Sequence, residues 1–269
     1  MDYRYIFGPV PSRRFGLSLG IDLVPQKVCS LNCLYCECGK TTQLTLERKE
    51  YIKSDDIIDE IKTYLKTPPK IDVITITGSG EPTLNSKIGE IINYIKKNYN
   101  YTTVLLTNGT LLYLRDVRNE ITPFDIVKIS LDAISQNNFK KINLAEHSLN
   151  NEDIINGILE FKKIYKGKIW IEIFIIPGIN DTIEEITLFK EKLLMISPDK
   201  IQLNTLHRPP AFQNIKKASK IELEYVKNLL DLDNVEIIGK FTEKELKNSL
   251  NETILLSLLK RRPLTLNDI

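Results

Sequence analysis

Cysteine is absent from most of this 269-residue chain, because all four cysteines lie between positions 29 and 38. Disulfides stabilise a fold mainly by closing long loops, and a cluster this short closes none. A cytosolic chain would also keep such thiols reduced. The cluster is therefore interpreted as a metal site and not as a disulfide framework.

Long apolar runs and an excess of one charge are missing as well. No stretch reaches the roughly 20 apolar residues that a helix needs to cross a bilayer, and the N-terminus lacks the features of a signal peptide. Lys and Arg total 37 against 35 Asp and Glu, which gives a net charge of +2. Bulk charge therefore gives no argument for nucleic-acid binding, although a local basic patch is still allowed. We expect a cytoplasmic globular protein without a membrane partner.

Strand-like and helix-like segments alternate along the chain. Strands are expected at 19–24, 71–77, 102–107, 126–131, 168–176, 200–206 and 235–238. Helices are expected at 54–65, 86–99, 111–120, 136–147, 151–165, 183–195, 222–232 and 243–260. Such alternation indicates parallel strands with right-handed crossovers. The count favours an α/β fold, a partial, open (β/α)6 barrel with an extra strand, over a flat doubly wound sheet.

This pattern divides the chain into three parts. We expect a basic, proline-rich extension at 1–17, the barrel at 18–210, and a C-terminal strand–helix extension at 211–269. Sites in such folds form at the carboxyl ends of the parallel strands, and the motifs described next all fall there.

The segment Cys29-x3-Cys33-x2-Cys36 offers three thiolates from one short loop. Three soft ligands suit a four-iron cluster that keeps one iron open to a small molecule. A structural zinc site with Cys38 as fourth ligand is the first alternative, but zinc ligands usually come as two separated pairs. A ferredoxin-like electron carrier is the second, and it also needs a fourth cysteine. Cys38 is close in sequence but is expected to face away.

The three cysteines, with the aromatic Tyr35 before the last of them, resemble the C-x3-C-x-Φ-C signature of the radical S-adenosylmethionine (radical SAM) superfamily. The resemblance implies a partial (β/α)6 barrel and a [4Fe–4S] cluster held by Cys29, Cys33 and Cys36. It also implies that the open iron binds SAM, whose reductive cleavage yields a 5′-deoxyadenosyl radical that removes hydrogen from a substrate. A flavodoxin or ferredoxin is the expected reductant.

A glycine-rich segment follows the second strand and resembles the family's GGEP motif, with a serine in place of its first glycine. The candidate SAM-binding residues here are Gly78, Ser79, Gly80, Glu81 and Pro82. Glycine lets the backbone approach a ligand closely, and a carbonyl or carboxylate can accept from the SAM ammonium group. A plain turn is the alternative.

Polar residues at later strand ends complete the expected cofactor site. They are Asn108, Ser130, Asp132, Pro177 and Asn204. The position of Ser130 and Asp132 resembles the family's ribose motif, and the segment at Pro177 corresponds to one that packs on adenine. A turn is an equal interpretation for Asn108, and Asp132 or Ser135 could instead cap a helix.

Four further residues are candidates for substrate contact. Gln202 shares one strand face with Asn204, so both are expected to line the barrel, and Arg208 follows the same strand. Arg13 and Arg14 form a basic pair suited to a carboxylate or phosphate, with a solvated charge pair as the alternative.

The start Pro-Ser-Arg-Arg-Phe-Gly, Cys36–Thr41, Ser79–Thr83 and the Asn204–Pro210 region together resemble a radical SAM subgroup related to the wyosine synthases, which build a tricyclic base on tRNA. Wyosine synthases carry further cysteines for a second cluster that engages pyruvate, and residues 1–28 contain none. A tRNA base, a peptide and a cofactor precursor therefore remain open as substrates. A non-catalytic iron–sulfur scaffold or a zinc-stabilised interaction protein are the functions outside this class.

Overall fold

A computed structural model describes residues 3–12, 14–238, 255–256, 259 and 263. Its main sheet comprises β1 (Ile6–Ser12), β2 (Gly16–Asp22), β5 (Val73–Thr77), β6 (Thr102–Thr107), β7 (Ile126–Ser130), β8 (Lys168–Phe174), β9 (Lys200–Asn204) and β10 (Val235–Ile237), hydrogen-bonded in that order. All neighbours are parallel except β1 and β2. The short strands β3 (Val28–Cys29) and β4 (Gln43–Leu44) pair separately.

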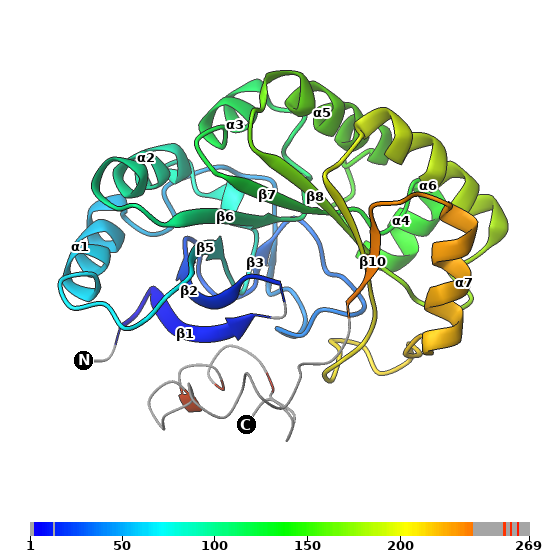
Figure 1. Cartoon of the computed structure of the whole chain (residues 1–269), viewed down its shortest axis with the longest axis horizontal. Coiled ribbons are helices and arrows are strands. Elements are labelled where there is room, and N and C mark those ends of the chain that lie inside the picture. Colours follow the sequence, from blue (N-terminus) through cyan, green and yellow to red (C-terminus); the bar gives the residue numbers. More distant parts are fainter. Residues whose placement is uncertain (1–2, 13, 239–254, 257–258, 260–262, 264–269) are drawn as a thin grey trace.

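Helices follow the parallel strands in turn. They are α1 (Ser54–Tyr64), α2 (Ile88–Asn98), α3 (Arg115–Glu120), α4 (Gln136–Asn143), α5 (Asn151–Ile164), α6 (Ile183–Ile196) and α7 (Lys220–Leu230), with a 3-10 turn at Pro82–Leu84. The sheet curves, and most of the helices lie along its outer side (Figure 1). The predicted partial (β/α)6 barrel with an extra strand is confirmed, and β1 and β10 are its edge strands.

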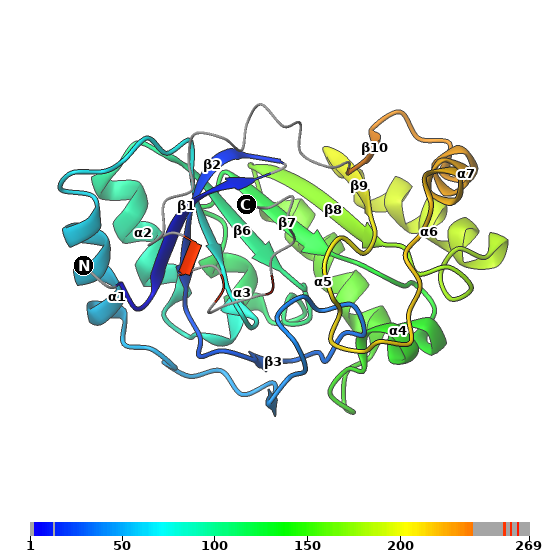
Figure 2. The ribbon, with the colours of Figure 1, turned by 90° about the horizontal axis from the view of Figure 1, so that it is seen from below.

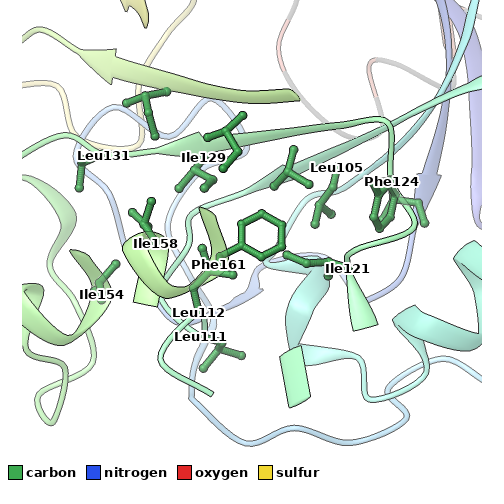
Figure 3. Packing of buried hydrophobic residues seen from close by; sticks show 14 of the residues in the cluster. Leu105, Leu111, Leu112, Ile121, Phe124, Ile129, Leu131, Ile154, Ile158 and Phe161 are labelled. Atoms are coloured by element: carbon green, nitrogen blue, oxygen red, sulfur yellow. The ribbon is translucent and has the colours of Figure 1, made fainter. Parts of the chain in front are cut away.

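The hydrophobic core lies between the sheet and the helices. On β8, Ile169, Ile171 and Ile173 face the helices and are almost fully buried, because successive strand residues point to opposite faces. Figure 3 shows the same layer around Phe161 of α5, which packs near Ile129 of β7. The other sheet face is the concave one, so its side chains line the inside of the barrel.

Strand β1 was not expected, because Gly8-Pro9-Val10-Pro11 has the composition of a loop. The strand nevertheless pairs antiparallel with β2, with a register shift between Phe7 and Val10. An edge strand tolerates proline, since one side of its backbone needs no partner, and a bulge absorbs the residues that cannot pair. The first part of the chain is therefore built into the sheet.

Two predicted helices are shorter than expected. The helix expected at 111–120 begins at Arg115, because Leu111 and Leu112 enter the core as a turn. There the carbonyl of Leu112 accepts from the Arg118 guanidinium at 2.7 Å. The helix expected at 136–147 ends at Asn143, where Leu144 adopts a left-handed conformation with φ of 40°. The helix expected at 243–260 falls almost entirely outside the described residues.

Candidate functional site

The loop after β2 carries all four cysteines past the carboxyl ends of the parallel strands (Figure 2). It is tied to its neighbours by backbone hydrogen bonds, from Glu81 N to the Val28 carbonyl at 3.0 Å and from Asn32 N to the Asn143 carbonyl at 2.9 Å. A Cβ on Gly80 would lie 2.1 Å from the Val28 carbonyl oxygen. Glycine is thus required where the segment after β5 touches the cysteine loop.

Each sulfur of the three-cysteine motif has a side-chain nitrogen donor from a different part of the chain. The pairs are Asn108 Nδ2 to Cys29 Sγ at 3.6 Å, Asn143 Nδ2 to Cys33 Sγ at 3.3 Å, and Lys27 Nζ to Cys36 Sγ at 3.1 Å. Lys27 is also 5% exposed, so its charge acts in a partly desolvated environment. Donors of this kind stabilise thiolates and orient them as ligands.

The sulfurs differ in how readily they lose a proton. Burial raises the pKa of Cys29 to about 12 and raises the pKa of Cys33 well above its usual value. The pKa of Cys36 is lowered to about 6, first by a hydrogen bond from Cys38 and then by Lys27. The expectation that Cys38 faces away was therefore wrong. Because a bound metal deprotonates its thiols, Cys29 and Cys33 become stable thiolates when they are ligands.

The three cysteine sulfurs lie near one another without forming a site for a single metal ion. Among the described residues, no three His, Cys, Asp or Glu side chains are placed to hold one metal ion. The charge of Cys36 nevertheless raises the pKa of both Cys29 and Cys33, so the three sulfurs lie within electrostatic range of one another. Ligands of a cubane are spread more widely than those of one zinc ion, because each thiolate binds a different iron.

Glu81, in the glycine-rich segment, is buried and fully engaged within the protein. Its carboxylate accepts from Thr83 N at 3.1 Å, Thr83 Oγ1 at 2.6 Å, Thr107 Oγ1 at 2.6 Å and Asn108 N at 2.8 Å. Burial raises the pKa of Glu81, and these hydrogen bonds oppose that rise. The side chain therefore braces the ends of β5 and β6.

Asp132, after β7, is a second buried carboxylate that organises the cysteine loop. It accepts from the Tyr35 hydroxyl at 2.5 Å, from Asn143 Nδ2 at 2.8 Å and from Phe174 N at 3.0 Å. Burial raises its pKa. The Tyr35 ring stacks on Phe174 with centroids 3.9 Å apart. Ser135 caps α4 by accepting from Asn138 N, so Asp132 does not have the capping role considered above.

The remaining expected cofactor residues lie at the neighbouring strand ends. Ser130 is the last residue of β7 and is aligned with Glu172 of β8. Pro177 follows β8 in a turn held by Asn180, whose Nδ2 donates to the carbonyls of Asp132 at 2.8 Å and Phe174 at 2.7 Å. Asn204 ends β9 and donates to Glu172 Oε1 at 3.1 Å.

A group of charged and polar side chains lies inside the barrel. Glu172 forms salt bridges with both Arg14 and Lys128. Arg14 Nε also donates to Gln202 Oε1 at 2.8 Å, although the two residues are 188 positions apart in the chain. Arg14 therefore reaches across the inner face of the sheet, and the structure brings two of the predicted substrate residues together.

A cavity of about 230 Å³ opens beside this group. Its lining comes from β1, β2, β5, β6 and β7, from the glycine-rich segment and from the cysteine loop. Cys38, Ser79, Arg14 and Lys128 all line it. Arg208 lines it too and pairs with Glu37 at 2.7 Å. Arg13 lies outside the described residues.

Sequence reasoning missed Lys27, Asn143, Lys128 and Glu172. Lys27 precedes the first cysteine by two residues, and Asn143 comes from a helix whose end could not be predicted. Lys128 and Glu172 carried a usable signal, because each is a charged residue inside an otherwise apolar strand. Such residues are buried only when they are paired, which points to a polar interior.

The described residues include no helix long and apolar enough to span a membrane.

In a comparison with known protein families, residues 23–189 match the model of the radical SAM superfamily.

Two relatives in sequence match nearly the whole chain. A UPF0026 protein from Helicobacter pylori is 39% identical over 268 residues, covering 97% of this chain and 85% of the relative. The GTPase Obg of Brachyspira hyodysenteriae is 35% identical over 268 residues. That match covers 98% of this chain but 39% of the length of that relative.

Solved structures show the same fold. A structure of TYW1 with a lysine–pyruvate adduct bound superposes with a TM-score of 0.62 at 22% identity. The superposition covers 81% of this chain and 74% of that one.

Proposed function

Because this chain belongs to the radical SAM superfamily, we propose that it is an enzyme that binds a [4Fe–4S] cluster and SAM and cleaves SAM reductively. When bound and reduced, the cluster supplies the electron that splits SAM into methionine and a 5′-deoxyadenosyl radical, which abstracts hydrogen from a substrate. The observation that carries the proposal is the set of three cysteine sulfurs at one edge of the sheet, each with its own nitrogen donor.

Cys29, Cys33 and Cys36 would hold the cluster, and the residues around them have supporting roles. The two amides, Asn108 and Asn143, orient the thiolates of Cys29 and Cys33. Lys27 places a positive charge beside the thiolate of Cys36 and offsets part of the negative charge of the ligand set.

The glycine-rich segment would hold the amino group of SAM through its backbone. The carbonyls of Ser79 and Glu81 already accept from Lys27 N at 2.9 Å and Leu84 N at 3.2 Å. We therefore assign the carbonyl of Gly80 as the acceptor for the SAM ammonium group. Gly78 and Pro82 shape the turn on either side, and Glu81 keeps it in place.

The other strand ends would bind the nucleoside part of SAM. Ser130 and Asn204 offer polar atoms for the ribose or the carboxylate, and Pro177 offers an apolar surface for adenine. Asp132 acts as a positioning residue, because its carboxylate is already bonded to Tyr35 and Asn143. Those contacts hold the cysteine loop against β7 and β8.

Aromatic residues of β1 and of the following turn line the lumen. Phe7 covers Gly20, whose Cβ, if present, would lie 2.1 Å from the Phe7 ring. Phe15 stacks on Trp170 with centroids 4.9 Å apart. Apolar rings at these positions would limit the access of water to a reactive radical.

We propose a tRNA base, a peptide or a cofactor precursor as the substrate. The reductant would be a flavodoxin or ferredoxin. Comparing the nucleosides of tRNA from cells with and without the protein, by mass spectrometry, tests the first class directly.

The proposed activity has a direct test. The full chain is reconstituted with iron and sulfide without oxygen, reduced, mixed with SAM and assayed for 5′-deoxyadenosine. The wild-type protein should form it, and Cys33→Ala should not, because one cluster ligand is lost. A reduced cluster that yields no 5′-deoxyadenosine from the wild-type protein would instead support an iron–sulfur scaffold.

A further inference from the structure

Two cations and one shared carboxylate meet inside the barrel. Glu172 accepts from Arg14 through Oε1 and from Lys128 through Oε2. Side-chain exposure is 13% for Arg14, 7% for Lys128 and 11% for Glu172. Arg14 and Lys128 thus each contact one oxygen of the same carboxylate. An anion with two or more oxygens could bridge the two cations in the same way.

The two carboxylates that line the cavity, Asp22 and Glu37, have other partners. Glu37 pairs with Arg208 at 2.7 Å, and Asp22 accepts from Ser79 N at 3.2 Å beside the glycine-rich segment. The Arg14 side chain also donates through Nε to Gln202, and its Nη1 has no hydrogen-bond partner in the described part of the chain. Arg14 therefore keeps one nitrogen for a ligand at the end of the cavity where it and Lys128 share Glu172.

A second unusual feature lies next to the lining residues Lys128 and Phe15. Trp170 is aligned with Lys128 across β7 and β8 and is 7% exposed, and its indole Nε1 is buried without a hydrogen-bond partner among the described residues. An unpaired buried donor is uncommon in a folded protein. Trp170 stacks on Phe15, which lines the cavity next to Arg14.

We propose that the lumen binds the substrate through a carboxylate or phosphate group held between Arg14 and Lys128. The proposal rests on the function proposed above and names the chemical class of its substrate. Glu172 is the positioning residue, because it fixes both cations on the inner face before the substrate arrives. The oxyanion occupies the cavity side of the two cations, so the rest of the substrate extends toward Ser79 and the cysteine loop.

The electrostatics of Lys128 agree with this geometry. The pKa of Lys128 is lowered to about 8, mainly by burial and also by the charge of Arg14, while Glu172 and Asp132 oppose the shift. A second anion beside Lys128 would relieve the repulsion between the two cations. Binding of an oxyanion would therefore favour the charged form of Lys128.

Binding of simple anions to the cluster-loaded full chain tests the proposal. Sodium phosphate and sodium acetate are titrated separately by calorimetry at constant ionic strength, with Trp170 fluorescence as a local reporter, since the chain has one tryptophan. We expect saturable binding with a Kd of about 1–10 mM for at least one of them. The preferred anion identifies the substrate group as a phosphate or a carboxylate.

Matched variants locate the site. Arg14→Met and Lys128→Met should each weaken binding at least about tenfold, the loss expected for one charge-assisted hydrogen bond. Arg14→Lys keeps the charge and should weaken it less, which keeps the test valid if Arg14→Met folds poorly. Lys190→Met removes an exposed lysine of α6 and should bind like the wild type.

The two proposals fail in different ways. Three results would each overturn the oxyanion site, whatever the yield of 5′-deoxyadenosine. They are the absence of saturable binding, heat without any change in Trp170 emission, and wild-type affinity in both Arg14→Met and Lys128→Met. Anion binding that follows the predicted pattern supports the site. If such a protein forms no 5′-deoxyadenosine from SAM, the proposed radical SAM activity is overturned and the site stands.

Discussion

The ammonium group of Lys27 lies 3.1 Å from the sulfur of Cys36, and the lysine is 95% buried with φ of 63°. The backbone of Lys27 is also held, since its N–H donates to the Ser79 carbonyl at 2.9 Å. The loop before the first cysteine thus delivers a fixed positive charge to the proposed cluster.

Replacing Lys27 with Met should lower the reduction potential of the bound cluster. Loss of one nearby positive charge makes addition of an electron harder, by on the order of 50–100 mV, which corresponds to about 1–2 kcal/mol for one electron. Redox titration followed by electron paramagnetic resonance (EPR) measures the shift. Lys27→Arg keeps the charge and serves as the control; equal potentials in Lys27→Met and the wild type would contradict the assigned role.

Cys38 should be dispensable for cluster binding although its sulfur contacts Cys36. Cys38→Ala should retain iron and sulfide at the wild-type ratio, whereas Cys29→Ala, Cys33→Ala and Cys36→Ala should each lose the intact cluster. Iron and sulfide analysis after anaerobic reconstitution gives the answer. Loss of the metal from Cys38→Ala would favour a four-cysteine site, as in the zinc or ferredoxin interpretations.

Glu81→Gln should destabilise the fold although it keeps the size of the side chain. The four donors around the carboxylate would then face an amide that accepts at one oxygen, at a cost of about 2–4 kcal/mol in the free energy of unfolding. Urea unfolding monitored by circular dichroism measures the loss. Glu160→Gln, on an exposed part of α5, is the matched control and should leave the midpoint unchanged.

Gly80→Ala should impair cluster loading. The added Cβ would clash with the Val28 carbonyl at 2.1 Å and push the strand that contains Cys29 away from β5. We expect a reduced iron content in a protein that still folds. Gly89→Ala in α2 meets only side-chain atoms of Glu120 within 3.4 Å, the nearest at 3.1 Å, and should load normally. Normal loading of both variants would show that the backbone contact is not required.

Stability should rise with pH through the titration of Lys128. The folded pKa is about 8 against an ordinary value of 10.5, so between these values the unfolded chain binds more protons than the folded one. Stability therefore increases with pH across this window, by up to about 3 kcal/mol. Lys128→Met should lack this component. Unfolding free energies of the two proteins should diverge above pH 8, and parallel curves would contradict the assignment.

The fold was largely predictable because each buried parallel strand is an apolar run that ends in a polar or glycine-containing turn. Strand β1 was not predictable, since its prolines are typical of a loop and its pairing with β2 leaves no signal in the sequence. The start of α3 was also mispredicted, because contacts distant from the segment decide its conformation. Leu111 and Leu112 have helical propensity, but their burial and the Arg118 contact hold them in a turn.

The part of the site whose residues are close together in the sequence could be predicted. The part formed by side chains on neighbouring strands could not, because it depends on how those strands are aligned. The three cysteines stand together in the sequence, so their common role could be inferred. The lumen cluster needed the alignment of β7, β8 and β9, which sets Ser130 against Glu172 and Glu172 against Gln202. The reach of Arg14 to Gln202 depends on the hairpin of β1 and β2, which the sequence did not reveal.

The central claim is that three cysteines leave one iron of the cluster free to bind SAM. EPR spectra of the reduced, reconstituted protein with and without SAM test it most directly. We predict that SAM changes the spectrum of the cluster in the wild-type protein and in Cys38→Ala, because the ligand joins the iron that has no cysteine. A spectrum that SAM leaves unaltered would contradict the account.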